Sequence, residues 1–165
     1  MPIITKADAK RDRDDGKDNP CGQFEAILYS DSGGLSQFGA FVEILPPGSA
    51  SSVKHWHARE DEMIYVLEGI ATVLEGDEEH QLTAGDAATF KAGTAVGHCV
   101  QNRSDRPVRY LVIGTRSPAD TVTYPDHNRV LHFARDDSGN VVERRYVTAK
   151  GAPADSPYKI NDNGS

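Results

Sequence analysis

Short runs of β-prone residues, separated by clusters of turn residues, fill the chain between Phe24 and Gly114. No segment repeats its apolar residues with a helical period over more than two turns. Many short strands at near-regular spacing are typical of an all-β sandwich or barrel. The expected strands are Phe24–Tyr29, Phe38–Leu45, Met63–Glu68, Ala71–Leu74, Ala87–Phe90, His98–Gln101 and Val108–Gly114.

One of these inter-strand regions carries a run of residues that suits metal binding. Side chains alternate on a strand, so His55 and His57 point to the same face while Trp56 points away. Glu62 follows a short polar turn that can return its carboxylate to the same point, and His98 supplies a third imidazole. Two or three imidazoles with a carboxylate are typical ligands of a divalent transition metal.

These residues carry a family resemblance. The run Gly48-x6-His55-x-His57-x4-Glu62-x6-Gly69 resembles the first motif of the cupin superfamily, and Gly85-x5-Lys91-x-Gly93-x4-His98-x3-Asn102 resembles the second. The first run has a longer spacer before His55 than is usual. The second has Lys91 where the family usually has proline, and a longer spacer before His98. These departures fall in turns, and the resemblance covers roughly residues 38–115.

The resemblance implies a small, single-domain, cupin-2-like metal-binding barrel, folded as a double-stranded β-helix, or jelly roll. It further implies that His55, His57, Glu62 and His98 together bind one divalent metal. Iron, manganese and nickel accept four such ligands with two open positions, whereas zinc, which is possible here, more often prefers a closed site of four ligands.

The flanks differ in composition from the expected barrel at residues 23–117. Residues 1–22 form a polar N-terminal segment, and residues 5–20 contain five basic and five acidic residues with almost nothing apolar, so we expect a mobile arm unless a partner subunit holds it. In residues 118–165, the runs Val130–Arg135 and Val141–Val147 predict a β-hairpin, followed by a polar, loosely held tail at Gly151–Ser165. The hairpin is expected to pack on the barrel or on a second subunit, because a lone hairpin is marginal in water. Cupins often dimerise through sheet faces, which favours a homodimer.

The composition excludes some partners. A formal charge of −7, without a cluster of Lys and Arg beside aromatic residues, argues against nucleic-acid binding. The sequence contains no apolar run long enough for a membrane span and no apolar stretch typical of a signal peptide. Two cysteines are too few for a disulfide framework. We therefore expect a cytoplasmic protein that acts on a small molecule.

Several functions fit such a metal site. The favoured one is a dioxygenase-type oxidoreductase acting on a small oxygenated metabolite, because metal and O2 demand little of the surrounding residues. The alternatives are a metal-dependent isomerase or lyase of a sugar or hydroxy acid, and a cupin that binds a small molecule such as a sugar without turnover. An isomerase or lyase needs a separate general acid or base beside the metal.

The sequence offers four candidates for that acid or base and two candidates for the pocket wall. Val66 shares the parity of Glu62 along its strand, so it is expected to line the pocket, and Tyr65 is expected to face outward. Tyr65 would serve as an acid or base only if a bulge turned it inward. The catalytic candidates are Glu43, Tyr65, Gln101 and Tyr110, and the expected pocket residues are Val66 and Val100.

Overall fold

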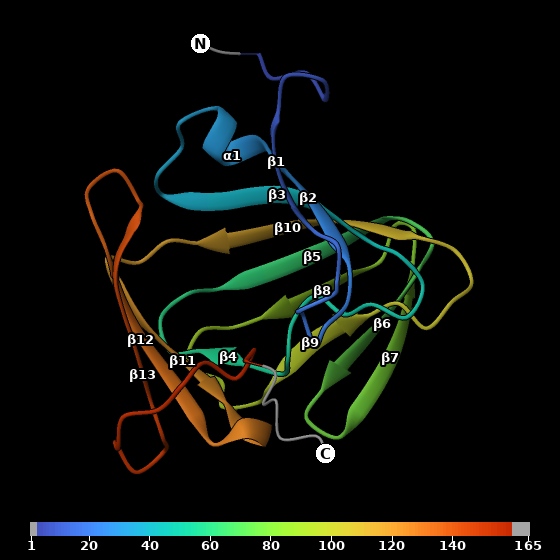
Figure 1. Ribbon diagram of the computed structural model, residues 1–165. Coiled ribbons are helices and arrows are strands. Elements are labelled where there is room, and N and C mark those ends of the chain that lie inside the picture. The colour runs from blue at the N-terminus through green and yellow to red at the C-terminus, as the bar shows by residue number, and fades with distance from the viewer. Residues whose placement is uncertain (1–2, 160–165) are drawn as a thin grey trace.

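The computed structural model describes residues 3–159 and is built almost entirely of antiparallel strands in three sheets (Figure 1). The six-stranded sheet runs in the order β1 (Lys10–Asp14), β2 (Phe24–Leu28), β3 (Phe38–Leu45), β10 (Val108–Thr115), β5 (Glu62–Glu68) and β8 (Ala87–Phe90). The three-stranded sheet is β7 (Glu78–Thr83), β6 (Ile70–Glu75) and β9 (His98–Gln101). The four-stranded sheet is β13 (Val141–Val147), β12 (Arg129–Arg135), β11 (Ala119–Tyr124) and β4 (Trp56–His57). Two short helical turns, α1 (Tyr29–Ser32) and the 3-10 turn η1 (Pro125–His127), interrupt them.

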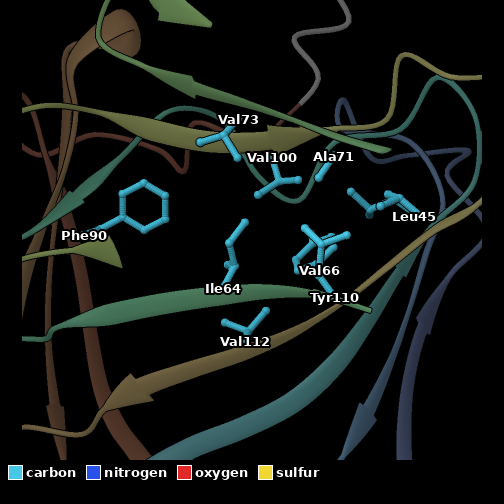
Figure 2. Close-up of a cluster of buried hydrophobic side chains, with 10 residues drawn as sticks. Leu45, Ile64, Val66, Ala71, Val73, Phe90, Val100, Tyr110 and Val112 are labelled. Carbon is cyan, nitrogen blue, oxygen red and sulfur yellow. The ribbon is translucent and has the colours of Figure 1, made fainter. Parts of the chain in front are cut away.

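The all-β jelly-roll expectation is confirmed, and its core lies between the six-stranded and three-stranded sheets. Figure 2 shows side chains of β5 and β10 pointing towards those of β6 and β9 across this space. Alternation along β5 buries Ile64 and Val66 and leaves Tyr65 40% exposed, which matches the period of two of a half-buried strand. The core residues are Leu45, Ile64, Val66, Ala71, Val73, Phe90, Val100, Val108, Tyr110 and Val112.

A glycine makes the tight turn from β5 into β6. Gly69 has φ +83°, a left-handed conformation that other residues adopt at a cost. A Cβ at this position would lie 2.7 Å from the carbonyl oxygen of Pro107. The turn therefore requires glycine both for its backbone conformation and for its close approach to the segment before β10.

The predicted C-terminal hairpin forms, and it belongs to the sheet that carries the histidine motif. β12 and β13 pair antiparallel, β11 pairs with β12, and β11 in turn pairs with β4, where Val122 lies opposite His57. In Figure 1 β11, β12 and β13 form the orange and red flank of the molecule. A second apolar cluster, Val122, Tyr124, Leu131 and Phe133, holds this flank together.

The described part of the tail differs from the expectation of a loosely held segment. Ala154 N–H donates to the carbonyl of Tyr146 at 3.1 Å, and Tyr158 packs against the second apolar cluster. The first residues of the tail thus fold back along β13. Residues 160–165 of the expected tail lie outside the described residues.

The N-terminal segment also differs from the expectation of a mobile arm. Residues 10–14 form β1, which pairs with β2 along its whole length. Arg11 and Arg13 both form ion pairs with Glu25 on β2. Charged side chains suit this position because β1 is an edge strand, where they discourage pairing with another chain. Sequence analysis missed the strand because it has no apolar face. Residues 1–2 of the expected arm lie outside the described residues.

None of the helices within residues 3–159 is long and apolar enough to cross a membrane.

Candidate metal centre and its cavity

Four side chains of the motif meet at one end of the barrel. His55 pairs with His98 through two backbone hydrogen bonds of 3.1 and 2.9 Å, and their ring centroids lie 4.9 Å apart. Glu62, the first residue of β5, places its Oε2 atom 3.7 Å from His98 Nε2 and 3.9 Å from His57 Nε2. The ligand atoms of His55, Glu62 and His98 all lie within 4.8 Å of one another. His55, Glu62 and His98 therefore converge on one point. His57 reaches this set through Glu62, while its ligand atom also groups with those of Glu60 and Asp120.

Hydrogen bonds on the far side of two rings direct the other nitrogens towards that point. His55 Nδ1 lies 3.1 Å from the carbonyl of Val53 and 3.1 Å from Ser52 Oγ. His57 Nδ1 lies 2.7 Å from Asp120 Oδ2. With a carboxylate or a carbonyl as acceptor, Nδ1 carries the proton, and Nε2 keeps its lone pair as a metal ligand needs.

His98 gives a direct test of whether these residues fit a metal. Its Nε2 atom is buried and has no hydrogen-bond partner within the described residues. Its ring stacks on Phe90, with centroids 3.6 Å apart and planes within 2° of parallel, so the nitrogen has one fixed direction. A buried, unpartnered imidazole nitrogen costs free energy unless something satisfies it. A metal ion beside Glu62 would do so, and the donor set fits one.

The ionisation of these groups also suits metal binding. Burial lowers the pKa of His55 to about 4, so the ring is neutral at neutral pH. Burial would raise the pKa of Glu62, but the nearby imidazoles of His98, His55 and His57 outweigh burial and lower that pKa. Burial is the largest influence on His57 and opposes its charged form, but the hydrogen bond with Asp120 and the charges of Glu62, Asp120 and Glu60 together raise its pKa. Neutral imidazoles and an ionised carboxylate are the forms that coordinate metals, so His55 and Glu62 are ready to bind, whereas a metal at His57 must displace a more tightly held proton.

Three residues around the centre were not found by sequence analysis. Asp120 accepts hydrogen bonds from His57 at Oδ2 and from the Arg59 backbone at Oδ1. Glu60 accepts hydrogen bonds from the backbone of Ser117 and from the Arg135 guanidinium. One signal could have drawn attention to Asp120, because it shares the buried parity of the apolar residues along β11. For Glu60 and Arg135 we find no signal in the sequence.

An open cavity of about 520 Å³ leads to the centre. His55, His57 and Glu62 line it, together with Ile64, Val100 and the candidate acid–base residues Glu43 and Tyr110.

The remaining sequence candidates lie elsewhere. Val66, expected in the pocket, is wholly buried one step deeper in the core, and Ile64 takes its place in the cavity wall. Tyr65 faces outward on β5. Gln101 lines a separate hollow near Cys21 and Asn102.

Glu43 and Tyr110 form a buried pair in this cavity. They lie directly opposite each other on β3 and β10, and the Tyr110 hydroxyl donates a short hydrogen bond to Glu43 Oε2. Burial raises the pKa of Glu43 to about 7, although the hydrogen bond from Tyr110 opposes the rise. Burial also raises the pKa of Tyr110 well above its usual value, so its hydroxyl remains protonated. A carboxyl group that titrates near neutrality can both take and return a proton.

Comparisons with known proteins agree with this geometry. The sequence profile of the family described as Cupin domain matches residues 41–114. A solved structure from Silicibacter pomeroyi, described as a sugar phosphate isomerase from a cupin superfamily, is 30% identical with a TM-score of 0.80. The match covers 96% of this chain and 100% of that one.

A second structure, from Acidithiobacillus ferrooxidans, is provisionally described as a sugar phosphate isomerase. It is 25% identical with a TM-score of 0.77, over 93% of this chain and 96% of that one. A structure from Thermotoga maritima, described as a predicted oxalate decarboxylase, is 20% identical with a TM-score of 0.57. That match covers 69% of this chain and 98% of that one, and it shows a shared fold alone. A search of curated proteins found no match. By profile, by full-length similarity and by fold, this chain belongs to the cupin superfamily.

Proposed function

We propose that this protein is a metal-dependent isomerase that interconverts the aldose and ketose forms of a small sugar phosphate. The observation that carries the proposal is the Glu43–Tyr110 pair, which shares one cavity with the cluster of three histidines and Glu62. The isomerase alternative needs an acid or base near the metal, and Glu43 lines the same cavity as the metal ligands. The full-length similarity to the Silicibacter protein supports a sugar phosphate as the substrate.

The four metal ligands and the Glu43–Tyr110 pair would have separate roles in this reaction. His55, His57, Glu62 and His98 would hold a divalent ion, for which iron, manganese and nickel are the first candidates and zinc another. When bound, that ion supplies Lewis acidity to a carbonyl and a neighbouring hydroxyl.

Glu43 takes the proton from the carbon next to the carbonyl and returns it to the former carbonyl carbon. A second proton passes between the two oxygens, so the product has the composition of the substrate. Tyr110 holds the carboxyl of Glu43 in place, because its hydroxyl donates to Oε2. The cavity is large enough for a small sugar and lined partly by apolar residues such as Ile64 and Val112.

The favoured sequence-based expectation, a dioxygenase, has less support. None of the relatives described above is named as an oxygenase. A dioxygenase also gives no role to a carboxyl group with a pKa of about 7 in the cavity.

The test uses full-length protein loaded separately with manganese, iron, nickel or zinc. Aldose phosphates of three to six carbons are incubated in D2O, and conversion is followed by NMR. We expect ketose to appear with deuterium at the carbon that received the proton. The His98→Ala variant should lose the activity together with the metal, whereas Glu43→Gln should lose activity and retain the metal.

Other outcomes would point elsewhere. Consumption of O2 with an enediol, catechol or β-diketone would favour the dioxygenase. Stoichiometric sugar binding without turnover by any metal-loaded form would favour the binding protein.

A further inference from the structure

A second cavity of about 480 Å³ adjoins the first and has no role in the function proposed above. The two cavities share His55, His57, Glu60 and Arg135 in their walls. The rest of the second wall comes from the inner face of the β11–β12–β13 sheet and from the returning tail. A ligand held at the metal centre could therefore extend into this second space.

The strand register places the metal centre and β13 at two ends of the same sheet. His57 lies opposite Val122, Val122 opposite Leu131, and Leu131 opposite Tyr146. At the usual strand spacing these three steps span about 14 Å between backbones. Side chains that project inward from both ends shorten that gap.

The charges in this wall favour an anion. Among the described residues, the carboxylate of Glu60 is already paired with Arg135, through Nη2–Oε1 and Nη2–Oε2 distances of 3.2 and 3.3 Å. Arg144 also lines the cavity, and it forms no ion pair with a carboxylate within residues 3–159. The wall therefore carries one uncompensated positive charge in a molecule whose net charge is −7.

Neutral hydroxyl groups line the same cavity as the exposed Arg144 side chain. Tyr124, Tyr146 and Tyr158 line the cavity with Ser156. Burial raises the pKa of both Tyr124 and Tyr158, so their hydroxyls remain protonated and able to donate. The charge of Arg144 opposes the rise at Tyr124, as expected if the guanidinium faces that ring. A guanidinium with several hydroxyl donors is a typical arrangement for binding phosphate.

We propose that this second cavity holds the phosphate group of the substrate, with Arg144 as its charged donor and the tyrosine hydroxyls completing the site. As a statement about a sugar phosphate, the assignment rests on the isomerase function proposed above. Arg144 would then determine specificity for phosphorylated over neutral sugars.

The neighbouring arginine is a matched control. Arg145 lies opposite His132 on β12, whereas Arg144 lies opposite Phe133, a residue of the cavity wall. Because side chains alternate on a strand, Arg145 projects from the other face of the sheet. Replacing either residue removes the same formal charge from the same strand, but only Arg144 lines the cavity.

The first experiment is calorimetric titration of metal-free protein with inorganic phosphate, so that no bound metal contributes an anion site. We expect the wild type and Arg145→Ala to bind with the same Kd, and Arg144→Ala to bind at least about tenfold more weakly. Arg144→Lys, which keeps the charge but loses the planar fork of donors, should recover part of the affinity. The proposal is overturned if the wild type binds no phosphate at millimolar concentrations, or if the two alanine variants behave alike.

A kinetic measurement separates this assignment from the proposed function. In the metal-loaded enzyme, Arg144→Ala should raise KM for a sugar phosphate about tenfold or more, with little change in kcat and none with the unphosphorylated sugar. If phosphate binds through Arg144 and no sugar is isomerised, the isomerase function fails and the anion site stands. If sugar phosphate is isomerised with an unchanged KM in Arg144→Ala, the anion site fails and the isomerase function stands.

Discussion

Asp120 uses both of its carboxylate oxygens as acceptors, one for the His57 ring and one for the Arg59 backbone. Burial raises the pKa of Asp120, but the hydrogen bond with His57 and two backbone hydrogen bonds outweigh it and lower that pKa. The residue is therefore an anion at neutral pH. A carboxylate that holds the far side of a ligating imidazole fixes the ring and raises its basicity.

Replacing Asp120 with asparagine should weaken metal binding about 10- to 100-fold. Asparagine can accept only one of the two hydrogen bonds, because its amide NH2 must face either the His57 ring or the Arg59 N–H. Competition with a metal-sensitive chelating dye would measure the change. An affinity equal to that of the wild type would contradict the role given to Asp120.

Glu43 should make the stability of the protein depend on pH. Its pKa is raised from 4.5 to about 7 by burial, so the folded state holds the proton more tightly than the unfolded chain does. This contribution is fully present below about pH 4.5 and is lost as pH rises to about 7. In metal-free protein, the free energy of unfolding should fall over that window, by an amount on the order of 3 kcal/mol, relative to the Glu43→Gln variant. Urea unfolding at several pH values measures this, and parallel curves for the two proteins would refute it.

Among the elements of the fold, the β5–β6 turn is the most constrained by its backbone. Gly69→Ala should destabilise the protein by about 2 kcal/mol or more, since it combines a left-handed backbone with a Cβ 2.7 Å from the Pro107 carbonyl. Gly48→Ala is the matched control, because Gly48 has the same φ of +83° and no atom within 4 Å of an added Cβ. Thermal unfolding should show the larger loss for Gly69→Ala. Equal losses would mean that the contact with Pro107 costs nothing.

The elements also show which parts of the structure the sequence could predict. The strands of the barrel, and the grouping of His55 with Glu62 and His98, follow from alternation, turn residues and motif spacing, which act over short distances. The Asp120–His57 contact depends on β11 pairing with β4, and 63 residues separate its two partners. No local pattern encodes that register, so the residues of the extension that reach the centre could not be named in advance.

The edge strand β1 was not predicted from the sequence for a different reason. β1 is held by backbone hydrogen bonds to β2 and by ion pairs with Glu25, not by apolar burial. A charged segment of this kind looks disordered when judged by its composition, because composition does not reveal an available strand edge. Choosing among Glu43, Tyr65, Gln101 and Tyr110 likewise required knowing which strands face each other across the cavity.

At the scale of the whole molecule, the extension and the barrel form one structure around the centre. Removal of residues 119–165 should therefore lower both the melting temperature and the affinity for metal. The truncation removes Asp120, the strand paired with β4 and the whole second apolar cluster except its partner Val53. Circular dichroism on heating, together with metal analysis, would check this. A truncated protein with the melting temperature and metal content of the full chain would contradict it.

A homodimer remains a proposal at this scale, drawn from the family resemblance. Light scattering of full-length protein should give twice the chain mass of 17.9 kDa. A monomer mass across the micromolar range would refute the dimer and would leave the centre unchanged, since all of its donors come from one chain.

The two-residue strand β4, held against β11, sets a rule for protein engineering. A designer who grafts this metal centre onto another barrel by copying the residues of the two motifs would transfer every donor atom and leave His57 free to rotate. The smallest portable unit includes Ala119–Tyr124, which brings Asp120 with it. Recombination between members of this superfamily should accordingly give working centres when the crossover falls before residue 55 or after residue 124, and loosely held ones when it separates His57 from Asp120.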